Sequence, residues 1–167
     1  MALDENYIQR AADITMIQDL MARYALALDY PLNGGKDYAD IFTDDGIFAM
    51  PEMFVEVRGR QELIEFAEGL HRTVPGLHHV ITNLAIDIDG DKARGRCELN
   101  EFMLRREAIY SNLHAWYEDD MVRRGDKWLF KIRRVHVTED MANVLTTGKI
   151  GEYFEGFLGV CQRFVRK

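Results

Sequence analysis

The chain has 167 residues, of which 47% are apolar and 29% charged, the balance of a folded globular domain rather than of a disordered tail. Lysine and arginine number 21 against 28 acidic residues, and the net charge of −7 argues against non-specific nucleic-acid binding, which requires a positive field. Its two cysteines, Cys97 and Cys161, stand far apart among apolar neighbours, which predicts buried free thiols rather than a disulfide framework or a zinc site. No signal-peptide pattern or membrane-spanning apolar stretch is visible, so we expect a cytoplasmic protein with no membrane partner.

The first half of the chain is typical of helices around a strand. Apolar residues recur at helical spacing from Ile14 to Leu28, where Asp13 is expected to cap the start, and a short second helix follows at residues 37–42. Residues 47–50 have the character of a strand, and helical spacing returns from Gln61 to Arg72.

The second half changes to the alternation of strands. Residues 84–88, 92–104, 111–122 and 127–137 are predicted strands, separated by turn signals such as Asp-Gly-Asp and Arg-Gly-Asp. Consecutive strands with short turns favour an antiparallel meander. The chain is therefore expected to be one α+β domain over residues 1–167.

A C-terminal tail, residues 138–167, follows the last strand. Apolar residues from Ile150 to Val165 have helical spacing, although three glycines weaken the helix. The tail could cover a pocket or a neighbouring subunit as a mobile lid, or it could pack as a static helix.

Two features could carry chemistry. Asp29 ends the first predicted helix within an apolar run, where a carboxylate is costly unless it is paired or exposed; a solvated acid at a helix end is the alternative. His78 and His79 open the first meander strand, and because neighbours on a strand face opposite sides, at most one of them enters a pocket. Histidine is the usual general base at neutral pH, and a carboxylate that accepts from its second nitrogen would raise its basicity.

The meander strands also carry polar residues where a plain core would have none. One interpretation is a sheet with one covered and one wet face, and this accounts for most of them. The other is a concave sheet whose inner face combines aromatic walls with a few polar groups, the composition of a small-molecule pocket. The polar residues are Asn100, Glu101, His114, Arg133, Arg134 and His136, and the candidate aromatic walls are Phe48, Phe102, Trp116 and Tyr117. No dinucleotide, P-loop, nucleophile-elbow or HExxH motif is present, so the sequence predicts neither a nucleotide nor a metal site.

Several segments in a fixed order carry a family resemblance. They are Ile17-Gln18-Asp19-Leu20-Met21-Ala22-Arg23-Tyr24, Ala27-Leu28-Asp29, Phe42-Thr43-Asp44-Asp45-Gly46, Val57-Arg58-Gly59-Arg60-Gln61-Glu62, His78-His79-Val80-Ile81-Thr82-Asn83 and Gly125-Asp126-Lys127-Trp128. Across most of residues 10–137 the chain resembles the NTF2-like superfamily of SnoaL-type, cystatin-like domains. The resemblance implies a cone in which N-terminal helices pack on a curved antiparallel sheet. This fold hosts isomerases, dehydratases, cyclases and non-catalytic modules, so it constrains architecture more than function.

Within this superfamily the chain is most similar to the branch of scytalone dehydratase, hexachlorocyclohexane dehydrochlorinase and bile-acid 7α-dehydratase, which are cofactor-free lyases. These enzymes pair an aspartate at the end of the first helix with a histidine at the start of a meander strand, and Asp29 and His79 match those positions. Tyr24 stands where a dehydratase of this group has a catalytic tyrosine. Glu101 falls where the bile-acid enzyme has an aspartate, and Arg133 where the dehydrochlorinase has an arginine.

The resemblance implies elimination from a small hydrophobic, cyclic or aromatic substrate, with no cofactor and no metal. His79 would take a proton from carbon, Asp29 would orient His79, and Tyr24 with Arg133 or Glu101 would handle the leaving group. Isomerisation, closure of a polyketide ring and loss of formaldehyde from an aromatic side chain need similar groups, so they stay open.

A non-catalytic role is the alternative of another class: a ligand-binding module, or a partner protein similar to the β subunits of aromatic-ring dioxygenases, which share the fold. An enzyme is expected to show an open cavity with Asp29 and His79 in hydrogen-bond contact, whereas a subunit is expected to show a filled cone. Members of the family pair through an uncovered sheet face, which implies a homodimer or a homotrimer.

Overall fold

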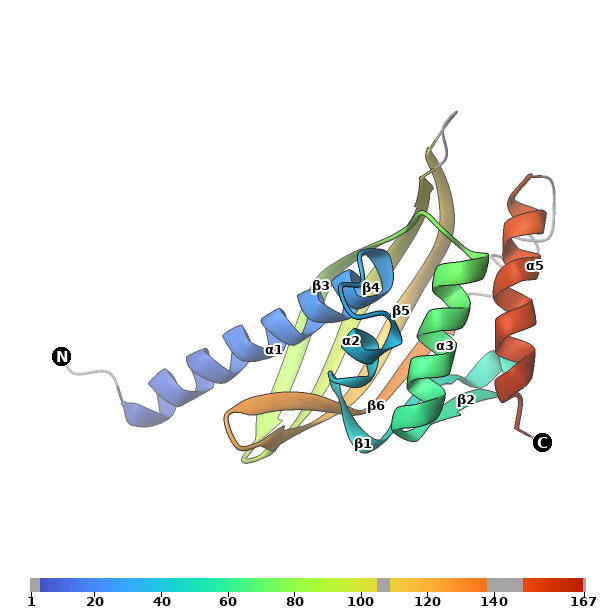
Figure 1. The fold of residues 1–167 in the computed structure, drawn as a ribbon. Coiled ribbons are helices and arrows are strands. Elements are labelled where there is room, and N and C mark those ends of the chain that lie inside the picture. The colour runs from blue at the N-terminus through green and yellow to red at the C-terminus, as the bar shows by residue number, and fades with distance from the viewer. Residues whose placement is uncertain (1–3, 105–108, 138–148, 167) are drawn as a thin grey trace.

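A helical layer covers one face of a strongly curved sheet in the computed structural model, which describes residues 4–104, 109–137 and 149–166 (Figure 1). The helices are α1 (Glu5–Asp29), α2 (Gly35–Ala39), α3 (Gly59–Thr73) and α5 (Lys149–Cys161), with short 3-10 turns η1 (Pro51–Met53) and η2 (Gln162–Phe164). The strands are β1 (Phe42–Met50), β2 (Val55–Arg58), β3 (Leu77–Asp89), β4 (Lys92–Leu104), β5 (Ile109–Arg124) and β6 (Lys127–Val137). The α+β class predicted from the sequence is confirmed, and the predicted elements occur in the expected order, but the short strand β2 was not among them.

The sheet has six strands in the order β2-β1-β6-β5-β4-β3. Strands β3 to β6 form the expected antiparallel meander, and β1 joins it by pairing parallel with β6. Gly90 and Gly125 sit in the two tight turns with φ of 57° and 61°, a left-handed conformation that glycine adopts without steric cost.

Alternation along the strands separates an inner from an outer face. On β4, each odd-numbered residue from Ala93 to Met103 is buried toward the helices, and the residues between them are exposed or half-buried. On β3 the pairing register shifts between Thr82 and Ala85, where Asn83 has φ of 53°. Such a bulge bends a strand and increases its twist, so it contributes to the curvature of the sheet around α1.

The first helix begins earlier than the sequence pattern predicted. Asp4, not Asp13, caps it, because the Asp4 carboxylate accepts a hydrogen bond from the amide of Asn6. Asp13 lies inside the helix with 2% exposure, where Arg123 donates to it at 2.5 Å and the indole of Trp128 at 3.0 Å. It therefore fastens α1 to the β5–β6 hairpin, and the prediction that it caps the helix is wrong.

The C-terminal helix α5 packs along α3 (Figure 1). Gly69 and Gly156 let the two helices approach closely, because they have no side chain at the contact. A Cβ added at Gly69 would lie 2.9 Å from a methyl of Val160, and one added at Gly156 would lie 3.0 Å from the carbonyl oxygen of Thr73. A packed helix is thus observed at residues 149–161, whereas residues 138–148 of the predicted tail lie outside the described part of the chain.

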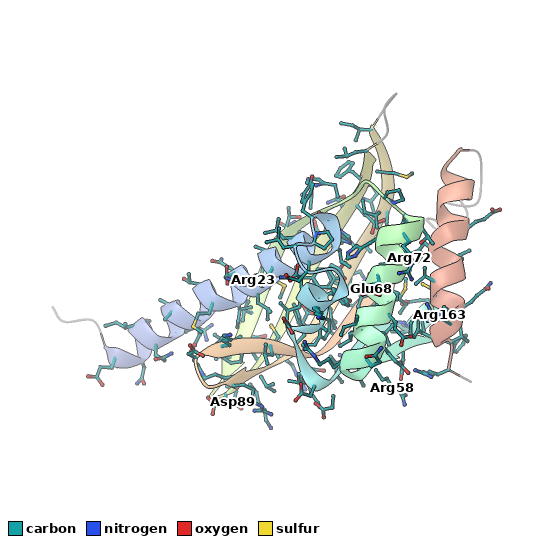
Figure 2. All side chains as sticks on the ribbon, viewed as in Figure 1. Arg23, Arg58, Glu68, Arg72, Asp89 and Arg163 are labelled. Carbon is teal, nitrogen blue, oxygen red and sulfur yellow. The ribbon has the colours of Figure 1, made fainter. Side chains whose placement is uncertain are left out.

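Charged side chains surround this core. Figure 2 shows Arg58, Glu68, Arg72 and Arg163 at the periphery of the α3–α5 side of the molecule. Arg163 donates to Glu65 at 3.0 Å, across the two helical segments. Cys97 and Cys161 are both buried and free, as the sequence predicted.

Candidate active site

The end of α1 meets the start of β3 through Asp29 and His79. One carboxylate oxygen of Asp29 lies 2.5 Å from Nδ1 of the His79 ring, and the other accepts the backbone amide of His79 at 2.8 Å. Both side chains are almost completely buried, with 3% and 4% exposure. Two contacts to one carboxylate fix both the rotation of the ring and the tautomer that carries its proton on Nδ1, which leaves Nε2 with a lone pair.

His78 takes the other side of the strand, as the alternation predicted. Its side chain is 40% exposed. Its Nδ1 lies 3.6 Å from the Asp29 oxygen that accepts the His79 amide, and 3.5 Å from the Tyr30 hydroxyl. Of the two neighbouring histidines, only His79 therefore enters the interior.

Glu101 approaches His79 from the opposite side. Strand register places it directly across from His79, and its carboxylate lies 3.5 Å from Nε2, beyond the usual hydrogen-bond range of about 2.7–3.2 Å. Burial lowers the pKa of His79, but the hydrogen bond to Asp29 and the charges of Glu101 and Asp29 outweigh that effect and raise it above its ordinary value of 6.5. His79 is consequently a stronger base than a free histidine.

Tyr24 and Arg133 extend this cluster into the core. The Tyr24 ring stands edge-on to the His79 ring, with ring centres 6.0 Å apart and an angle of 90°. The guanidinium of Arg133 lies over the Tyr24 ring at 4.0 Å and over the Tyr117 ring at 3.6 Å, and Arg133 has no solvent exposure. Asp119, equally buried, accepts from Arg133 at 3.2 Å.

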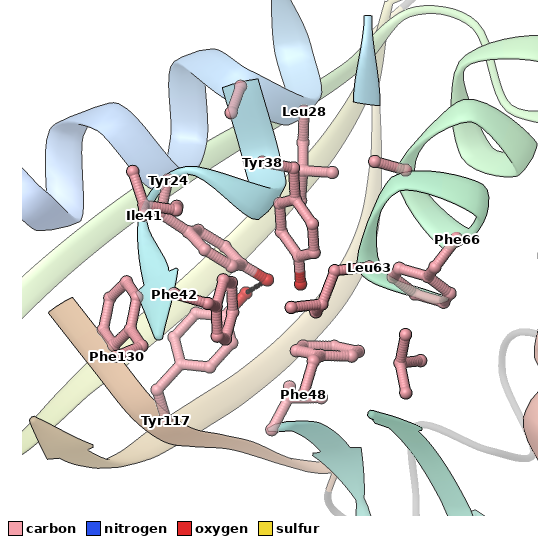
Figure 3. Close-up of a cluster of buried hydrophobic side chains, with 14 of the residues drawn as sticks. Tyr24, Leu28, Tyr38, Ile41, Phe42, Phe48, Leu63, Phe66, Tyr117 and Phe130 are labelled. Carbon is pink, nitrogen blue, oxygen red and sulfur yellow. Dashed lines mark hydrogen bonds between the residues drawn. The ribbon is translucent and has the colours of Figure 1, made fainter. Parts of the chain in front are cut away.

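Three tyrosine hydroxyls converge beside this cation. Figure 3 shows the hydroxyl ends of Tyr24, Tyr38 and Tyr117 directed toward one another, and Tyr117 donates to Tyr24 at 3.2 Å. Burial raises the pKa of all three hydroxyls above the ordinary value of 10, although Arg133 opposes the shift. The three groups are thus neutral phenols at physiological pH, able to donate as well as to accept hydrogen bonds.

Five of the predicted site residues are brought together by the fold: Tyr24, Asp29, His79, Glu101 and Arg133. Phe48 also points inward, where it packs on Phe66 with ring centres 5.1 Å apart. It lies in the aromatic layer next to Tyr38.

Phe102 and Trp116 do not join the cluster, which corrects their expected place in the inner wall. Phe102 follows Glu101 and Trp116 precedes Tyr117, and both of these neighbours face inward. Because neighbours on a strand face opposite sides, Phe102 and Trp116 lie on the outer face of the sheet. There Trp116 stacks on His136 with ring centres 4.1 Å apart. The sequence identified the aromatic residues of these strands, but the phase of the alternation was assigned only by the packing.

Asp119 is a residue that the sequence analysis missed. Its side chain is buried on the inner face of β5, as are those of Tyr117 and Met121, two positions before and after it. It lies directly opposite Arg133 in the pairing of β5 with β6. The spacing of two from Tyr117 was the available signal, because it predicts a carboxylate on the same face as an aromatic residue of the core.

Two hollows are found elsewhere on the described surface. The larger, about 1020 Å³, runs along α1 and α2 and includes Leu26, Tyr30 and Trp128. The smaller, about 530 Å³, lies on the outer sheet face beside Arg96, His114 and Trp116. Neither of these two is lined by Asp29 or His79, and the inner side chains around Tyr24 are tightly packed.

Within the described ranges, no group of three or more His, Cys, Asp or Glu side chains is arranged to hold a metal ion. No helix there is both long and apolar enough to cross a membrane.

Comparison with known proteins places these residues in a family. The uncharacterized protein Rv2910c of Mycobacterium tuberculosis (strain H37Rv) is 27% identical over 139 residues, which cover 77% of this chain and 86% of that protein. A variant of Rv3472, a protein of unknown function from the same species, has a solved structure with a TM-score of 0.87 at 24% identity, covering 100% of this chain and 98% of its own. A structure from Novosphingobium aromaticivorans, named as a proposed scytalone dehydratase, has a TM-score of 0.65 at 22% identity and covers 77% and 86%.

The model of the SnoaL-like domain matches residues 9–134, which include all five clustered site residues. The extent of that match, together with the cone of helices on a curved sheet, confirms the resemblance seen in the sequence: the chain belongs to the SnoaL-like family of the NTF2-like fold.

Proposed function

We propose that the protein is a cofactor-independent lyase that eliminates water or another small leaving group from a small hydrophobic, cyclic or aromatic substrate. The observation that carries the proposal is the contact between the Asp29 carboxylate and Nδ1 of His79, in which both side chains are buried. In a general base of this kind, the carboxylate accepts from Nδ1 of the histidine, and the lone pair of Nε2 can then take a proton from the substrate.

In the proposed reaction, Nε2 of His79 takes a proton from a carbon next to an activating group. The pair of electrons left on carbon forms the new double bond as the leaving group departs from the neighbouring carbon. Asp29 holds the ring in place and stabilises the imidazolium that forms, because its carboxylate already accepts from Nδ1.

The departing group needs a proton, and we assign its delivery to one of two residues. Tyr24 accepts a hydrogen bond from Tyr117, so its own proton is free for donation, and Arg133 above its ring stabilises negative charge on its oxygen. Glu101, facing Nε2 of His79, is the second candidate, because it can receive the proton from the imidazolium and pass it on. Each general acid or base step contributes about 10²–10⁴-fold to the rate.

The surroundings favour an apolar substrate. Aromatic rings from α1, α2, β1 and β5 surround the hydroxyl cluster, and exclusion of water by such rings strengthens each remaining polar contact (Figure 3). The side chains of His79 and Glu101 retain 4% and 11% exposure, whereas Tyr24 and Arg133 as whole residues have 1% and none, so we expect substrate to approach from the His79–Glu101 side.

The test is a screen of hydroxylated and halogenated cyclic compounds for loss of water or acid, compared with the variants Asp29→Asn and His79→Ala. His78→Ala is the matched control, because His78 is the exposed neighbour on the same strand. Turnover that is lost in the first two variants and kept in the control supports the proposal. Turnover that survives His79→Ala contradicts it.

Isomerisation, ring closure or release of formaldehyde at the same site would use the same base, and the products of the screen distinguish them from elimination.

A non-catalytic role is a second candidate, and the tight packing around Tyr24 favours it. In that case the screen shows no turnover, although a hydrophobic compound or a partner chain binds. Calorimetric titration with aromatic compounds that bind equally to the wild type and to His79→Ala would favour this role over the lyase.

Self-association through the outer sheet face belongs to the same proposal. That face carries Phe102 and the Trp116–His136 stack, which are incompletely buried, beside the hollow of about 530 Å³. An aromatic patch surrounded by charged residues is typical of a protein interface, and a homodimer or homotrimer would cover it.

A further inference from the structure

We propose that Asp119 is a positioning residue for the reaction: it fixes the Arg133 guanidinium against the ring of Tyr24, and so holds the Tyr24 hydroxyl in place beside His79. The inference rests on the proposed lyase function. It adds a residue that touches neither His79 nor Asp29 in any contact described above, and it assigns to the buried ion pair a task other than stability.

Arg133 is held chiefly by Asp119. One of its terminal nitrogens donates to Asp119 at 3.2 Å and contacts the sulfur of Met21 at 3.1 Å, while the other contacts the sulfur of Cys97 at 3.8 Å. Sulfur atoms are weak acceptors, so the carboxylate of Asp119 is the strong partner of this cation. Loss of that carboxylate would leave the guanidinium as an uncompensated buried charge beside the two phenol rings.

The position of Arg133 in turn fixes the ring of Tyr24. The guanidinium lies between the rings of Tyr24 and Tyr117, at 4.0 Å and 3.6 Å from their centres, and 4.6 Å from that of Phe130. A cation over an aromatic face both attracts the ring and fixes its plane. The Tyr24 hydroxyl is thereby held where Tyr117 donates to it.

The charges of Arg133 and Asp119 act on the Tyr24 hydroxyl in opposite directions. An isolated cation at this distance favours the ionised form of Tyr24, which can no longer give a proton, and the negative charge of Asp119 offsets that effect. Burial raises the pKa of Asp119 to about 7, so its carboxylate offsets the charge of Arg133 most fully above that pH. The titratable and charged groups around Tyr24 come from five strands and helices: Arg133 on β6, Tyr117 and Asp119 on β5, Cys97 and Glu101 on β4, His79 on β3, and Tyr38 on α2.

The neighbouring position supplies a matched control. Asp120 follows Asp119 on β5 but faces the outer side, where it accepts from Arg134 at 2.9 Å and is 38% exposed. Asp120→Asn thus breaks a pair of the same composition, on the same two strands, without touching the interior.

The experiment follows the ionisation of Tyr24 by NMR in protein with isotope-labelled tyrosine, with Tyr24→Phe used to assign the signal. In folded Asp119→Asn, we expect Tyr24 to ionise at lower pH than in the wild type, and kcat to fall about 100-fold with little change in KM, as expected for a misplaced reacting group. Asp120→Asn should match the wild type in both measurements. Unchanged titration of Tyr24 in folded Asp119→Asn overturns the proposal.

Asp119→Asn removes half of a buried pair and could fail to fold. For that case the double variant Asp119→Leu/Arg133→Met replaces the pair by apolar residues of similar size, a change that buried ion pairs often tolerate. Loss of the nearby cation should then move the ionisation of Tyr24 to higher pH, and a wild-type titration in this variant overturns the proposal.

The two measurements separate this inference from the function on which it rests. If the wild-type protein turns over no compound of the screen, the proposed lyase function fails. The titration of Tyr24 still decides whether Asp119 sets the state of that hydroxyl.

Discussion

The carboxylate of Asp29 holds His79 twice, through the ring Nδ1 at 2.5 Å and through the backbone amide at 2.8 Å. These two contacts join the last residue of α1 to the beginning of β3, fifty positions further along the chain. The orientation of the base is thus determined by the same interaction that places the first helix against the sheet. Changes at Asp29 are expected to alter both the chemistry and the local packing.

Asp29→Asn should lower kcat by about 10²–10⁴-fold, because the amide no longer stabilises the imidazolium or selects the Nδ1–H tautomer. The backbone amide of His79 can still donate to the amide oxygen, so we expect the fold to be kept. Steady-state kinetics together with circular dichroism measure both effects. A folded variant with wild-type kcat would contradict the assignment of Asp29.

Glu101→Gln should move the acidic limb of the kcat/KM profile to lower pH. The base acts when His79 is neutral, and the charge of Glu101 helps to raise the pKa of His79 above 6.5, so removal of that charge lets the ring deprotonate earlier. A pH–rate profile over the neutral range checks the direction. Glu98→Gln, on the outer face of the same strand, is the control that should leave the limb in place.

The same raised pKa predicts a dependence of stability on pH. Because the folded protein binds the His79 proton more tightly than the unfolded chain, this contribution to the free energy of unfolding is complete below the unfolded pKa of 6.5. It is lost as pH rises through the higher folded pKa. Urea unfolding at a series of pH values should show this loss in the wild type and a smaller one in Glu101→Gln.

Asp13→Asn should destabilise the fold by about 3 kcal/mol, the lower end for a broken buried ion pair, since Arg123 keeps some exposure and a second contact to Asp91. Asp19→Asn breaks the exposed pair with Arg23 on the same helix and should cost about 0.5 kcal/mol or less. Chemical denaturation of the two variants compares them directly. Equal losses would mean that Asp13 does not fasten α1 to the β5–β6 hairpin.

Gly69→Ala should destabilise the contact between α3 and α5, because the new methyl would lie 2.9 Å from a methyl of Val160. Val160→Ala makes room for it, so we expect the double variant to lose less stability than the sum of the two single changes. A thermal-melting cycle of the four proteins measures this coupling.

Trp116→Ala should weaken self-association and leave the site on the inner face unchanged, since Trp116 lies on the outer face of the sheet. Light scattering after size exclusion gives the molar mass over a range of concentrations. Asp89→Asn, at the exposed end of β3 (Figure 2), is the control for a change outside the patch. A monomeric wild type would contradict the proposed interface.

The sequence by itself determined the α+β class, most of the helices and strands, and the choice of Asp29 and His79 as candidate site residues. The spacing of apolar residues is a local property, so the meander and the helical segments predicted at residues 61–72 and 150–165 lie within a few positions of the observed strands β3 to β6 and helices α3 and α5. Resemblance to the family then pointed to Asp29 and His79, and alternation alone indicated that only one of the two histidines turns inward.

Only the tertiary structure decided what depends on residues far apart in the chain. The role of Asp13 changed from cap to buried anchor because Arg123 and Trp128, more than a hundred residues away, come to meet it. Phe102 and Trp116 lie on the outer face and not on the inner one as expected, because the helical layer that packs on the sheet determines which residues of each strand face inward. Asp119 could be recognised only in the same way, because a single carboxylate in a strand gives no signal in the sequence. The strand register places the buried Arg133 opposite it, in surroundings where an unpaired charge would cost too much free energy.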